Sequence, residues 1–251
     1  MPPETGRPFC IIKAGDTYPR LARTQGDFQD WVAAGLSRAG PGRHGTGAKV
    51  VDPRRAGPLP DPADCAGVVM TGSHAMVTDW APWMARLADW LAEVLAADVP
   101  FLGICFGHQL LARALGGQVD YHPDGREVGT VSITLEPAAR DDPLFARLPE
   151  RFQAHVVHAQ SVRTLPPGAV RLAGNGFEPT QAFRAGSQAW GVQFHPEFDG
   201  IRMAAYVDAL AGELARAGRD PRSLRAGIHE TPMAASLLPA FSALCRNRMD
   251  G

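Results

Sequence analysis

The residue best placed to act as a nucleophile is Cys105, in the segment Gly103-Ile-Cys-Phe-Gly107. An apolar run ends at this segment and a helical pattern begins directly after it, so the sequence predicts a strand, a sharp turn and a helix. The flanking glycines remove side chains that would clash in a strained turn, and such a turn exposes its central residue at the carboxyl edge of a sheet. The following helix directs free N–H groups and the positive end of its dipole at the sulfur, which favours the thiolate.

A cysteine nucleophile needs a base, and the base needs a partner that orients it. Both residue types occur where a predicted strand runs directly into His195-Pro196-Glu197. Pro196 fixes its own φ and restricts His195 to extended backbone, so the imidazole and the carboxylate stand on a stiff strand end. A His-x-Glu pair also occurs in zinc deaminases, but this sequence lacks the Pro-Cys-x-x-Cys motif that they need. Such a pair alone would be an ordinary surface feature; with Cys105 it becomes specific.

The elements that must position these residues begin as a wound α/β pattern. Buried strands are predicted at residues 8–14, 48–52 and 66–70. Helical spacing of apolar residues predicts one helix through Phe28, Trp31, Val32 and Leu36 and another through Trp83, Leu87, Trp90, Leu91 and Val94. Asp79 is the expected N-cap of the second helix, with Pro82 in its first turn. The order of elements up to Gly117 favours a mostly parallel sheet covered by helices.

Beyond Gly117 the sequence changes to short β-branched and aromatic runs, which predict further strands, several of them antiparallel. We expect these strands at residues 128–135, 152–157, 170–173, 181–184 and 188–194. A single helical turn is expected at 142–149, packed by Leu144 and Phe145, and helices at 201–217 and around 237–245. We expect one α/β domain over residues 1–251, with a core at about 8–217 and a C-terminal helical extension at 218–251.

Composition limits the partners. The net charge is −1 and no basic cluster is interleaved with aromatic residues, so neither nucleic acid nor an anionic membrane is an expected partner. No signal-peptide pattern and no membrane-length apolar run occur, so a cytoplasmic location is expected. The four cysteines have no C-x-x-C spacing, which argues against a zinc ribbon and a disulfide framework. Cys10 is interpreted as a core residue, and Cys65 and Cys245, which lack neighbouring bases, as inert.

Several other residues have simpler interpretations. Gly40–Gly45 matches G-x-G-x-x-G but follows a helix and precedes a strand, the reverse of the dinucleotide-binding context, so it is interpreted as a loop. His108 is expected to point away from the sulfur, in a packing or solvent position. His74 either lines the entrance of the site or lies in an exposed loop, and His155 is interpreted as a strand residue.

Taken together, the motifs resemble those of the class I (triad-type) glutamine amidotransferases, in particular stand-alone members similar to the amidotransferase domain of GMP synthase. The resemblance rests on residues 100–109 and 191–197, and residues 70–73, 115–117 and 158–166 support it by order and spacing. It implies a flavodoxin-like wound sheet. It also implies hydrolysis of the glutamine side-chain amide through a cysteine thioester, with the ammonia passed to a synthetase.

The resemblance assigns roles to individual residues. Cys105 would be the nucleophile, His195 the general base and acid, and Glu197 the carboxylate that orients His195. The backbone N–H groups of Gly72 and Phe106 would hold the oxyanion, each contributing on the order of a few kcal/mol. Substrate contacts are expected from Gln109 and from the segment His158, Ala159 and Gln160.

The same resemblance leaves the ammonia acceptor open. No metal or organic cofactor is required for this chemistry. The roughly 50 residues after Phe198 are too few for a synthetase domain, so the acceptor would be a separate synthetase subunit. Two alternatives remain: a free-standing hydrolase of γ-glutamyl amides or peptides, and a non-catalytic binding or regulatory module. The presence of all three triad residues argues against the module.

Overall fold

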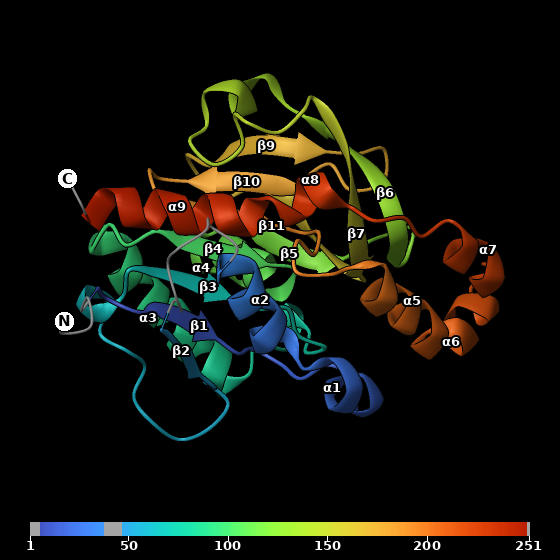
Figure 1. Cartoon of the computed structure of the whole chain (residues 1–251), viewed down its shortest axis with the longest axis horizontal. Coiled ribbons are helices and arrows are strands. Elements are labelled where there is room, and N and C mark those ends of the chain that lie inside the picture. Colours follow the sequence, from blue (N-terminus) through green and yellow to red (C-terminus); the bar gives the residue numbers. More distant parts are fainter. Residues whose placement is uncertain (1–5, 38–46, 250–251) are drawn as a thin grey trace.

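A nine-stranded mixed sheet runs through the computed structural model, which describes residues 6–37 and 47–249. Its strand order is β2-β1-β3-β4-β11-β10-β9-β6-β7 (Figure 1). The first five in this order are parallel: β2 (Ala48–Val51), β1 (Phe9–Ile12), β3 (Gly67–Met70), β4 (Phe101–Ile104) and β11 (Ala189–Val192). The others are antiparallel: β10 (Ala182–Ala185), β9 (Val170–Gly174), β6 (Glu127–Leu135) and β7 (Arg151–His158). β5 (Gln118–Tyr121) and β8 (Gln160–Thr164) form a separate antiparallel pair.

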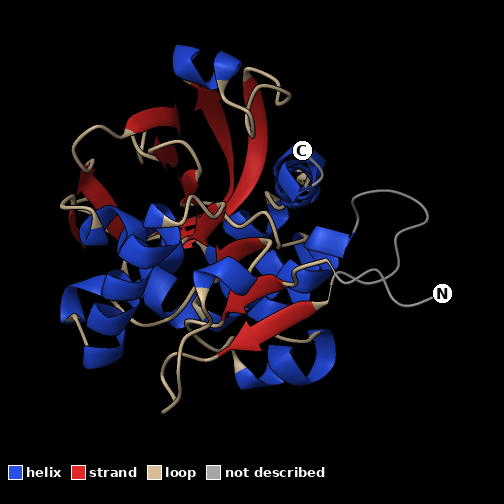
Figure 2. Ribbon diagram, turned by 90° about the vertical axis from the view of Figure 1, so that its left-hand side faces the viewer, coloured by secondary structure: helices blue, strands red, loops and turns tan. Residues whose placement is uncertain are grey.

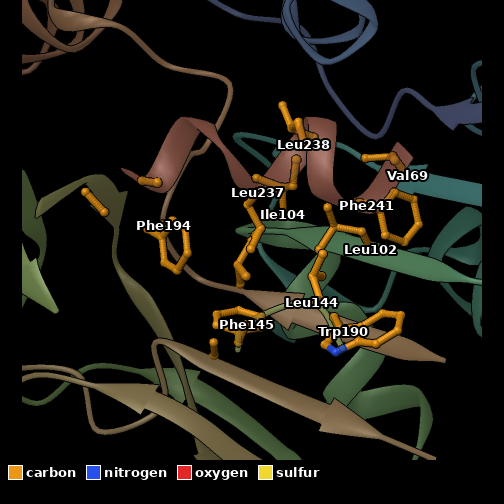
Figure 3. Packing of buried hydrophobic residues seen from close by; sticks show 14 of the residues in the cluster. Val69, Leu102, Ile104, Leu144, Phe145, Trp190, Phe194, Leu237, Leu238 and Phe241 are labelled. Carbon is orange, nitrogen blue, oxygen red and sulfur yellow. The ribbon is translucent and has the colours of Figure 1, made fainter. Parts of the chain in front are cut away.

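Helices cover both faces of the parallel strands, as the edge-on view in Figure 2 shows. α2 (Phe28–Ser37) and α9 (Leu237–Met249) pack together on one face, and α3 (Pro82–Ala96) and α4 (Phe106–Ala114) on the other. Because strand side chains alternate between faces, Ile11 of β1 packs in the α2 and α9 layer, while Ile12 packs in the α3 and α4 layer. Figure 3 shows the first layer, where Leu238 and Phe241 of α9 lie over the sheet.

A third group of helices gathers beyond the carboxyl ends of the parallel strands (Figure 1). It comprises α1 (Pro19–Gln25), α5 (Gly200–Ala209), α6 (Ala211–Arg216) and α7 (Pro221–Ala226), and α8 (Pro232–Ala235) then leads into α9. Their buried side chains, among them Leu21, Met203 and Tyr206, form a cluster with Phe28 and Phe198. Within residues 6–37 and 47–249, no helix combines the length and apolar character needed to cross a membrane.

The predicted fold class is confirmed: the chain begins with parallel strands, antiparallel strands follow, β11 returns to lie parallel to β4, and helices flank the sheet. Every strand expected from the sequence is present within a few residues of its predicted position. The short pair β5 and β8 was not predicted. The G-x-G-x-x-G match at Gly40–Gly45 lies outside the described residues.

Two local predictions were wrong. Asp79 does not cap α3: it ends a 3-10 helix (Val77–Asp79), and the N-cap is Ala81, because the residue before Pro82 is held in extended backbone. By contrast, the single helical turn expected at 142–149 is present, because the N–H of Ala146 donates to the carbonyl oxygen of Asp142 at 2.9 Å and Leu144 and Phe145 are buried. A 3-10 helix over Pro137–Asp141, which was not predicted, precedes it.

The second wrong prediction was a continuous helix at 201–217. The chain turns at Leu210, which has φ −91° and ψ 1°, and this divides the segment into α5 and α6. Tyr206, Leu210 and Leu214 remain buried on both sides of the turn. The turn therefore lets the apolar side of both short helices follow the surface they cover.

Candidate active site

Cys105 occupies the turn between β4 and α4 with φ +50°, a conformation that is costly for a residue with a Cβ atom. Positions 103 and 107 on either side of it must be glycine, because no Cβ atom fits at either one. A Cβ on Gly103 would lie 2.4 Å from the carbonyl oxygen of Gly107, and one on Gly107 would lie 2.7 Å from that of Met70. The predicted strand, sharp turn and helix are thus confirmed, and the cysteine is held in backbone strain at the carboxyl edge of the sheet.

His195 and Glu197 follow β11, the strand that pairs with β4. Nδ1 of His195 lies 2.8 Å from Oε1 of Glu197, and both side chains are almost completely buried. The backbone N–H of His195 donates to the carbonyl oxygen of His155, and the ring of Phe198 stacks on the imidazole at 4.2 Å. The imidazole is therefore fixed from its backbone, from its Nδ1 atom and from one ring face.

The electrostatics of the site favour a charged imidazole. Burial opposes protonation of His195, but the Glu197 carboxylate and the neighbouring Cys105 outweigh it and raise the pKa of His195 to about 10. His195 is therefore an imidazolium at neutral pH. Since Nδ1 is occupied by Glu197, Nε2 is the nitrogen left to face Cys105.

The two candidate oxyanion donors lie beside this group. A Cβ placed on Gly72, just after β3, would be 3.1 Å from Cε1 of His195 and 3.8 Å from Cβ of Cys105. Phe106 is the first residue of α4, and an N–H at this position has no acceptor within its own helix. Both backbones are thus close to the thiol, and their role as donors stays a prediction.

A cavity of about 240 Å³ brings the remaining candidates together. Its lining includes Cys105 and His195 and all four residues expected to bind substrate, Gln109, His158, Ala159 and Gln160. Nε2 of Gln109 donates to the carbonyl oxygen of Gln160 at 2.8 Å and to Oε1 of Gln193 at 2.9 Å. Both amide hydrogens of Gln109 are therefore used within the protein, and only its Oε1 atom is left for a ligand.

An aromatic wall that the sequence did not reveal closes one side of the cavity. It consists of Tyr18, Phe28 and Tyr206 together with His74. The ring of His74 lies 4.7 Å from that of Tyr18, and its Nε2 lies 3.2 Å from the hydroxyl of Tyr206. His74 therefore lines the cavity, while the residue as a whole stays exposed in its loop. Burial lowers the pKa of His74, which favours its neutral form.

An ion pair also borders the cavity. Nε of Arg126 donates to Oε1 of Glu213 at 2.9 Å, and both residues belong to the lining. These residues come from segments with no motif in the sequence, so only the fold reveals their proximity to the candidate triad.

Two further histidines and the three other cysteines occupy packing positions. His108 is completely buried against Phe183, and burial lowers its pKa to about 3. His155 is also buried, which lowers its pKa to about 4. Cys10, Cys65 and Cys245 are buried away from this cavity, and burial raises the pKa of Cys245 to about 12. Among the described residues, no group of three or more His, Cys, Asp or Glu side chains is arranged to hold a metal ion.

Comparison with known proteins adds an independent observation. Residues 54–207 match the family described as glutamine amidotransferase class-I. The chain is 36% identical over 132 residues to the glutamine-hydrolysing GMP synthase of Porphyromonas gingivalis. The aligned residues make up 52% of this chain and 24% of that protein. It is 34% identical over 139 residues to a protein of Haloarcula marismortui named as one subunit of a glutamine-hydrolysing GMP synthase, covering 55% of this chain and 67% of that protein.

Solved structures share the fold. A glutamine amidotransferase from Thermotoga maritima superposes with a TM-score of 0.71 at 22% identity, covering 96% of this chain and 98% of that chain. A likeness at this identity concerns the fold alone. The chain spans about a quarter of the length of the first curated GMP synthase it matches.

Proposed function

This chain belongs to the class I glutamine amidotransferase family, and from that premise we propose that it hydrolyses the side-chain amide of glutamine and releases ammonia. The observation that carries the proposal is the arrangement around Cys105. A strained turn presents the sulfur to His195, and Glu197 holds the imidazole through a 2.8 Å contact in a buried site. This is the arrangement that nucleophilic cysteine chemistry requires.

In the first half-reaction, the Cys105 sulfur attacks the amide carbon of glutamine. The amide oxygen becomes an oxyanion, which the N–H groups of Gly72 and Phe106 stabilise. The imidazolium of His195 then donates its proton to the amide nitrogen, the C–N bond breaks, and ammonia leaves. A γ-glutamyl thioester on Cys105 remains. The raised pKa of His195 suits this proton donation, because the acid form predominates at neutral pH.

In the second half-reaction, water replaces ammonia. The neutral His195 left by the first step takes a proton from water, which attacks the thioester carbon. The C–S bond breaks, glutamate leaves and the Cys105 thiolate is restored beside the imidazolium. Glu197 stabilises the positive charge of His195 in both steps and keeps its Nδ1 atom occupied.

Substrate recognition follows from the hydrogen bonds of Gln109. Because its amide nitrogen is used by Gln160 and Gln193, Oε1 is the atom available to the substrate, and it accepts from an N–H of glutamine. His158, Ala159 and Gln160 form the neighbouring wall of the cavity and hold the α-amino and α-carboxylate groups.

The ammonia acceptor is proposed to be a separate synthetase subunit. The support is the match to a protein that is itself named as one subunit of a GMP synthase, 67% of which is covered by this chain. A pulldown of the tagged protein from cell extract tests this part. Recovery of a nucleotide-activating enzyme that stimulates ammonia release supports it, and a chain that shows full turnover alone contradicts it.

A second candidate is hydrolysis of γ-glutamyl amides or peptides with a larger leaving amine. It is favoured by the extent of the cavity, whose lining continues from the triad to Tyr18, Arg126 and Glu213. Aromatic and charged side chains there offer contacts that ammonia does not need. Comparison of kcat/KM for glutamine with that for γ-glutamyl dipeptides discriminates between the two candidates.

The decisive experiment measures ammonia release from glutamine by the purified protein. We expect turnover by the native chain and none by Cys105→Ala. Cys65→Ala is the matched control, since it removes a buried cysteine that is absent from the cavity lining. Absence of turnover with glutamine and with a panel of γ-glutamyl compounds, with and without cell extract, would rule out the enzymatic function.

A further inference from the structure

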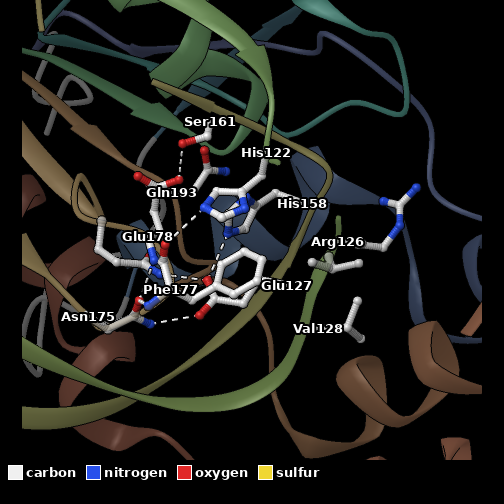
Figure 4. A network of polar contacts seen from close by, with 12 residues as sticks. His122, Arg126, Glu127, Val128, His158, Ser161, Asn175, Phe177, Glu178 and Gln193 are labelled. Atoms are coloured by element: carbon white, nitrogen blue, oxygen red, sulfur yellow. Dashed lines mark hydrogen bonds and ion pairs between the residues drawn. The ribbon is translucent and has the colours of Figure 1, made fainter. Parts of the chain in front are cut away.

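Behind the cavity wall that carries His158 lies a group of buried polar side chains centred on Glu127 (Figure 4). Glu127 itself lies outside the segments on which the family resemblance rests. Glu127 begins β6 and His158 ends β7, and the register of the two antiparallel strands pairs these residues directly. The inference drawn from this group rests on the proposed function, because it concerns how the same cavity holds its substrate.

Glu127 is surrounded by hydrogen-bond donors. Its Oε2 atom lies 2.9 Å from Nε2 of His158 and accepts from Nε2 of Gln181 at 2.8 Å. Its Oε1 atom accepts from Nδ2 of Asn175 at 2.8 Å. The contact with His158 contains one proton, and because an imidazole is ordinarily more basic than a carboxylate, we assign this proton to Nε2 of His158. The ionised Glu127 then accepts all three contacts. The side chain is 7% exposed, and a buried anion of this kind needs a cation beside it.

His158 lies between two acceptors. Nε2 faces the Glu127 carboxylate, and Nδ1 lies 2.9 Å from the backbone carbonyl oxygen of Gln160. A neutral imidazole carries one N–H, so one of its nitrogens would oppose an oxygen with a lone pair. Only the imidazolium donates to both. Glu127 is thus the anion that a charged His158 requires, and His158 is the cation that a buried Glu127 requires.

Other charged groups nearby already have partners. The guanidinium of Arg126 binds Glu213 rather than Glu127, and the buried carboxylate of Glu178 accepts from Ser161 and from the N–H of Thr180. His108, which is electrostatically coupled to His158, is buried, and its pKa is lowered to about 3, so it is neutral. Among the described residues, Glu127 is therefore the carboxylate that can act as the counter-ion of His158.

We propose that Glu127 is a positioning residue, which keeps His158 as an imidazolium and thereby fixes the atoms that face the substrate. The connection runs through the carbonyl oxygen of Gln160. This oxygen accepts from both Nδ1 of His158 and Nε2 of Gln109, which uses its two lone pairs. A neutral His158 with its proton on Nε2 repels this carbonyl. The shift of the carbonyl releases the amide of Gln109, whose Oε1 atom then no longer points reliably at the substrate.

The first test is a spectroscopic measurement on the native protein. Long-range ¹H–¹⁵N NMR of ¹⁵N-histidine-labelled protein at neutral pH reports whether each ring nitrogen carries a proton. The His158 signals are assigned by their loss in His158→Gln. We expect protons on both nitrogens of His158. A neutral His158 in a single tautomer would overturn the proposal, and this readout needs neither turnover nor a folded Glu127 variant.

The second test is Glu127→Gln. The substituted side-chain amide carries no negative charge, and its NH₂ group faces N–H donors that Glu127 accepted from. We therefore expect a neutral His158. We also expect KM for glutamine to rise about tenfold, which is more than any change in kcat. Alkylation of Cys105 by iodoacetamide should stay within about twofold of the native rate, because this small reagent does not use the substrate contacts. An unchanged KM would contradict the positioning role.

Glu178→Gln is the matched control, since it neutralises a buried carboxylate in the same network that does not contact His158. It is expected to leave the protonation of His158 unchanged, and a loss of the His158 charge in this variant as well would count against a specific role for Glu127. Native protein that releases no ammonia from glutamine or from the γ-glutamyl panel, with and without cell extract, refutes the proposed function, whereas the NMR spectrum still upholds or overturns the charged pair.

Discussion

Glu197 is buried next to His195, and its Oε1 atom is the partner of the Nδ1 atom of that imidazole. The contact has two consequences for the proposed reaction, in which His195 gains and loses a proton. It selects the tautomer in which Nε2 faces Cys105, and it stabilises the charged form that burial alone would disfavour. A carboxylate both selects this tautomer and stabilises the charged imidazole. An amide of the same shape can only select the tautomer, and only when its oxygen faces Nδ1.

We therefore predict that Glu197→Gln lowers kcat for glutamine about a hundredfold or more while KM changes little, because the interaction matters most when His195 is charged. Steady-state ammonia release measures this loss. Thermal unfolding of the variant shows whether the fold is kept. A kcat within threefold of the native value in a folded variant would mean that Glu197 does not support His195 in the reaction.

The raised pKa of His195 also makes a prediction about stability. Its folded pKa of about 10 lies above the ordinary value of 6.5, so the folded state holds a proton that the unfolded chain releases between these pH values. This contribution to stability is complete below about pH 6.5 and is lost as the pH rises through 10. The free energy of unfolding should fall by about 1 kcal/mol per pH unit in this window.

Urea unfolding of the native protein and of His195→Gln between pH 6 and pH 10, roughly the titration window, measures this effect. The difference between the two free energies isolates His195 from the other groups that titrate in this range. We expect the difference to shrink steadily as the pH rises. Parallel curves for the two proteins would show that His195 is not charged in the folded state.

Which site residues the sequence can reveal depends on how the chain brings them together. Cys105, His195 and Glu197 can be predicted as candidate site residues, because each lies in a short motif whose local geometry exposes its side chain at a strand end. The contact between Glu127 and His158 cannot be predicted from the sequence. The two residues are 31 positions apart, and their contact depends on the register of the strands that carry them. Register is set by the hairpin and by packing on both faces, and a shift by one residue would separate the two side chains.

At the scale of elements, the turn around Cys105 shows how neighbouring strands enforce a strained residue. The carbonyl oxygens of Gly107 and Met70 approach Gly103 and Gly107 so closely that no Cβ fits at either position. The packing of α4 against β3 and β4 therefore sets the conformation of Cys105, and its cost is offset by the burial of these elements.

Gly103→Ala tests this dependence. The added methyl would meet the backbone of Gly107 and His108 at 2.4 to 2.8 Å, so α4 must shift. We predict a loss of about 2 kcal/mol or more in the free energy of unfolding and at least a tenfold slower alkylation of Cys105 by iodoacetamide. Gly176→Ala is the control, since its Cβ would meet no atom within 4 Å. Equal stability of the two variants would contradict a packed turn.

The same scale shows where sequence patterns stop being informative. Strands such as β3 and β4 are predicted because all four of their side chains are buried and the runs are apolar. β5 was missed because three of its four residues, Gln118, Asp120 and Tyr121, are exposed and only Val119 is buried. The break at Leu210 was missed because apolar spacing continues across it, and the change in direction is imposed by the surface underneath.

At the scale of the whole molecule, the last helix completes the core that supports the site. α9 packs on α2, and its side chains Leu238, Phe241 and Cys245 are completely buried in the same cluster as β1, β4 and β11. The ring of Phe241, labelled with Trp190 in Figure 3, meets Trp190 of β11 edge to face at 6.3 Å. It also lies 6.5 Å from the ring of Phe9 of β1. Residues from the two ends of the sequence thus pack beneath the strands that lead to Cys105 and His195.

This arrangement predicts that Phe241→Ala destabilises the protein without altering its chemistry. Removal of a fully buried phenylalanine should cost about 3 to 5 kcal/mol, through lost apolar burial and the cavity left between Phe9 and Trp190. Urea unfolding measures the loss, and Ile201→Ala, which truncates a side chain that is 63% exposed, should change stability by less than about 0.5 kcal/mol.

KM for glutamine should stay unchanged below the unfolding transition, because Phe241 is not part of the cavity lining and its ring packs on Phe9 and Trp190 instead. If Phe241→Ala were as stable as Ile201→Ala, α9 would not be part of the core that holds the parallel strands in place.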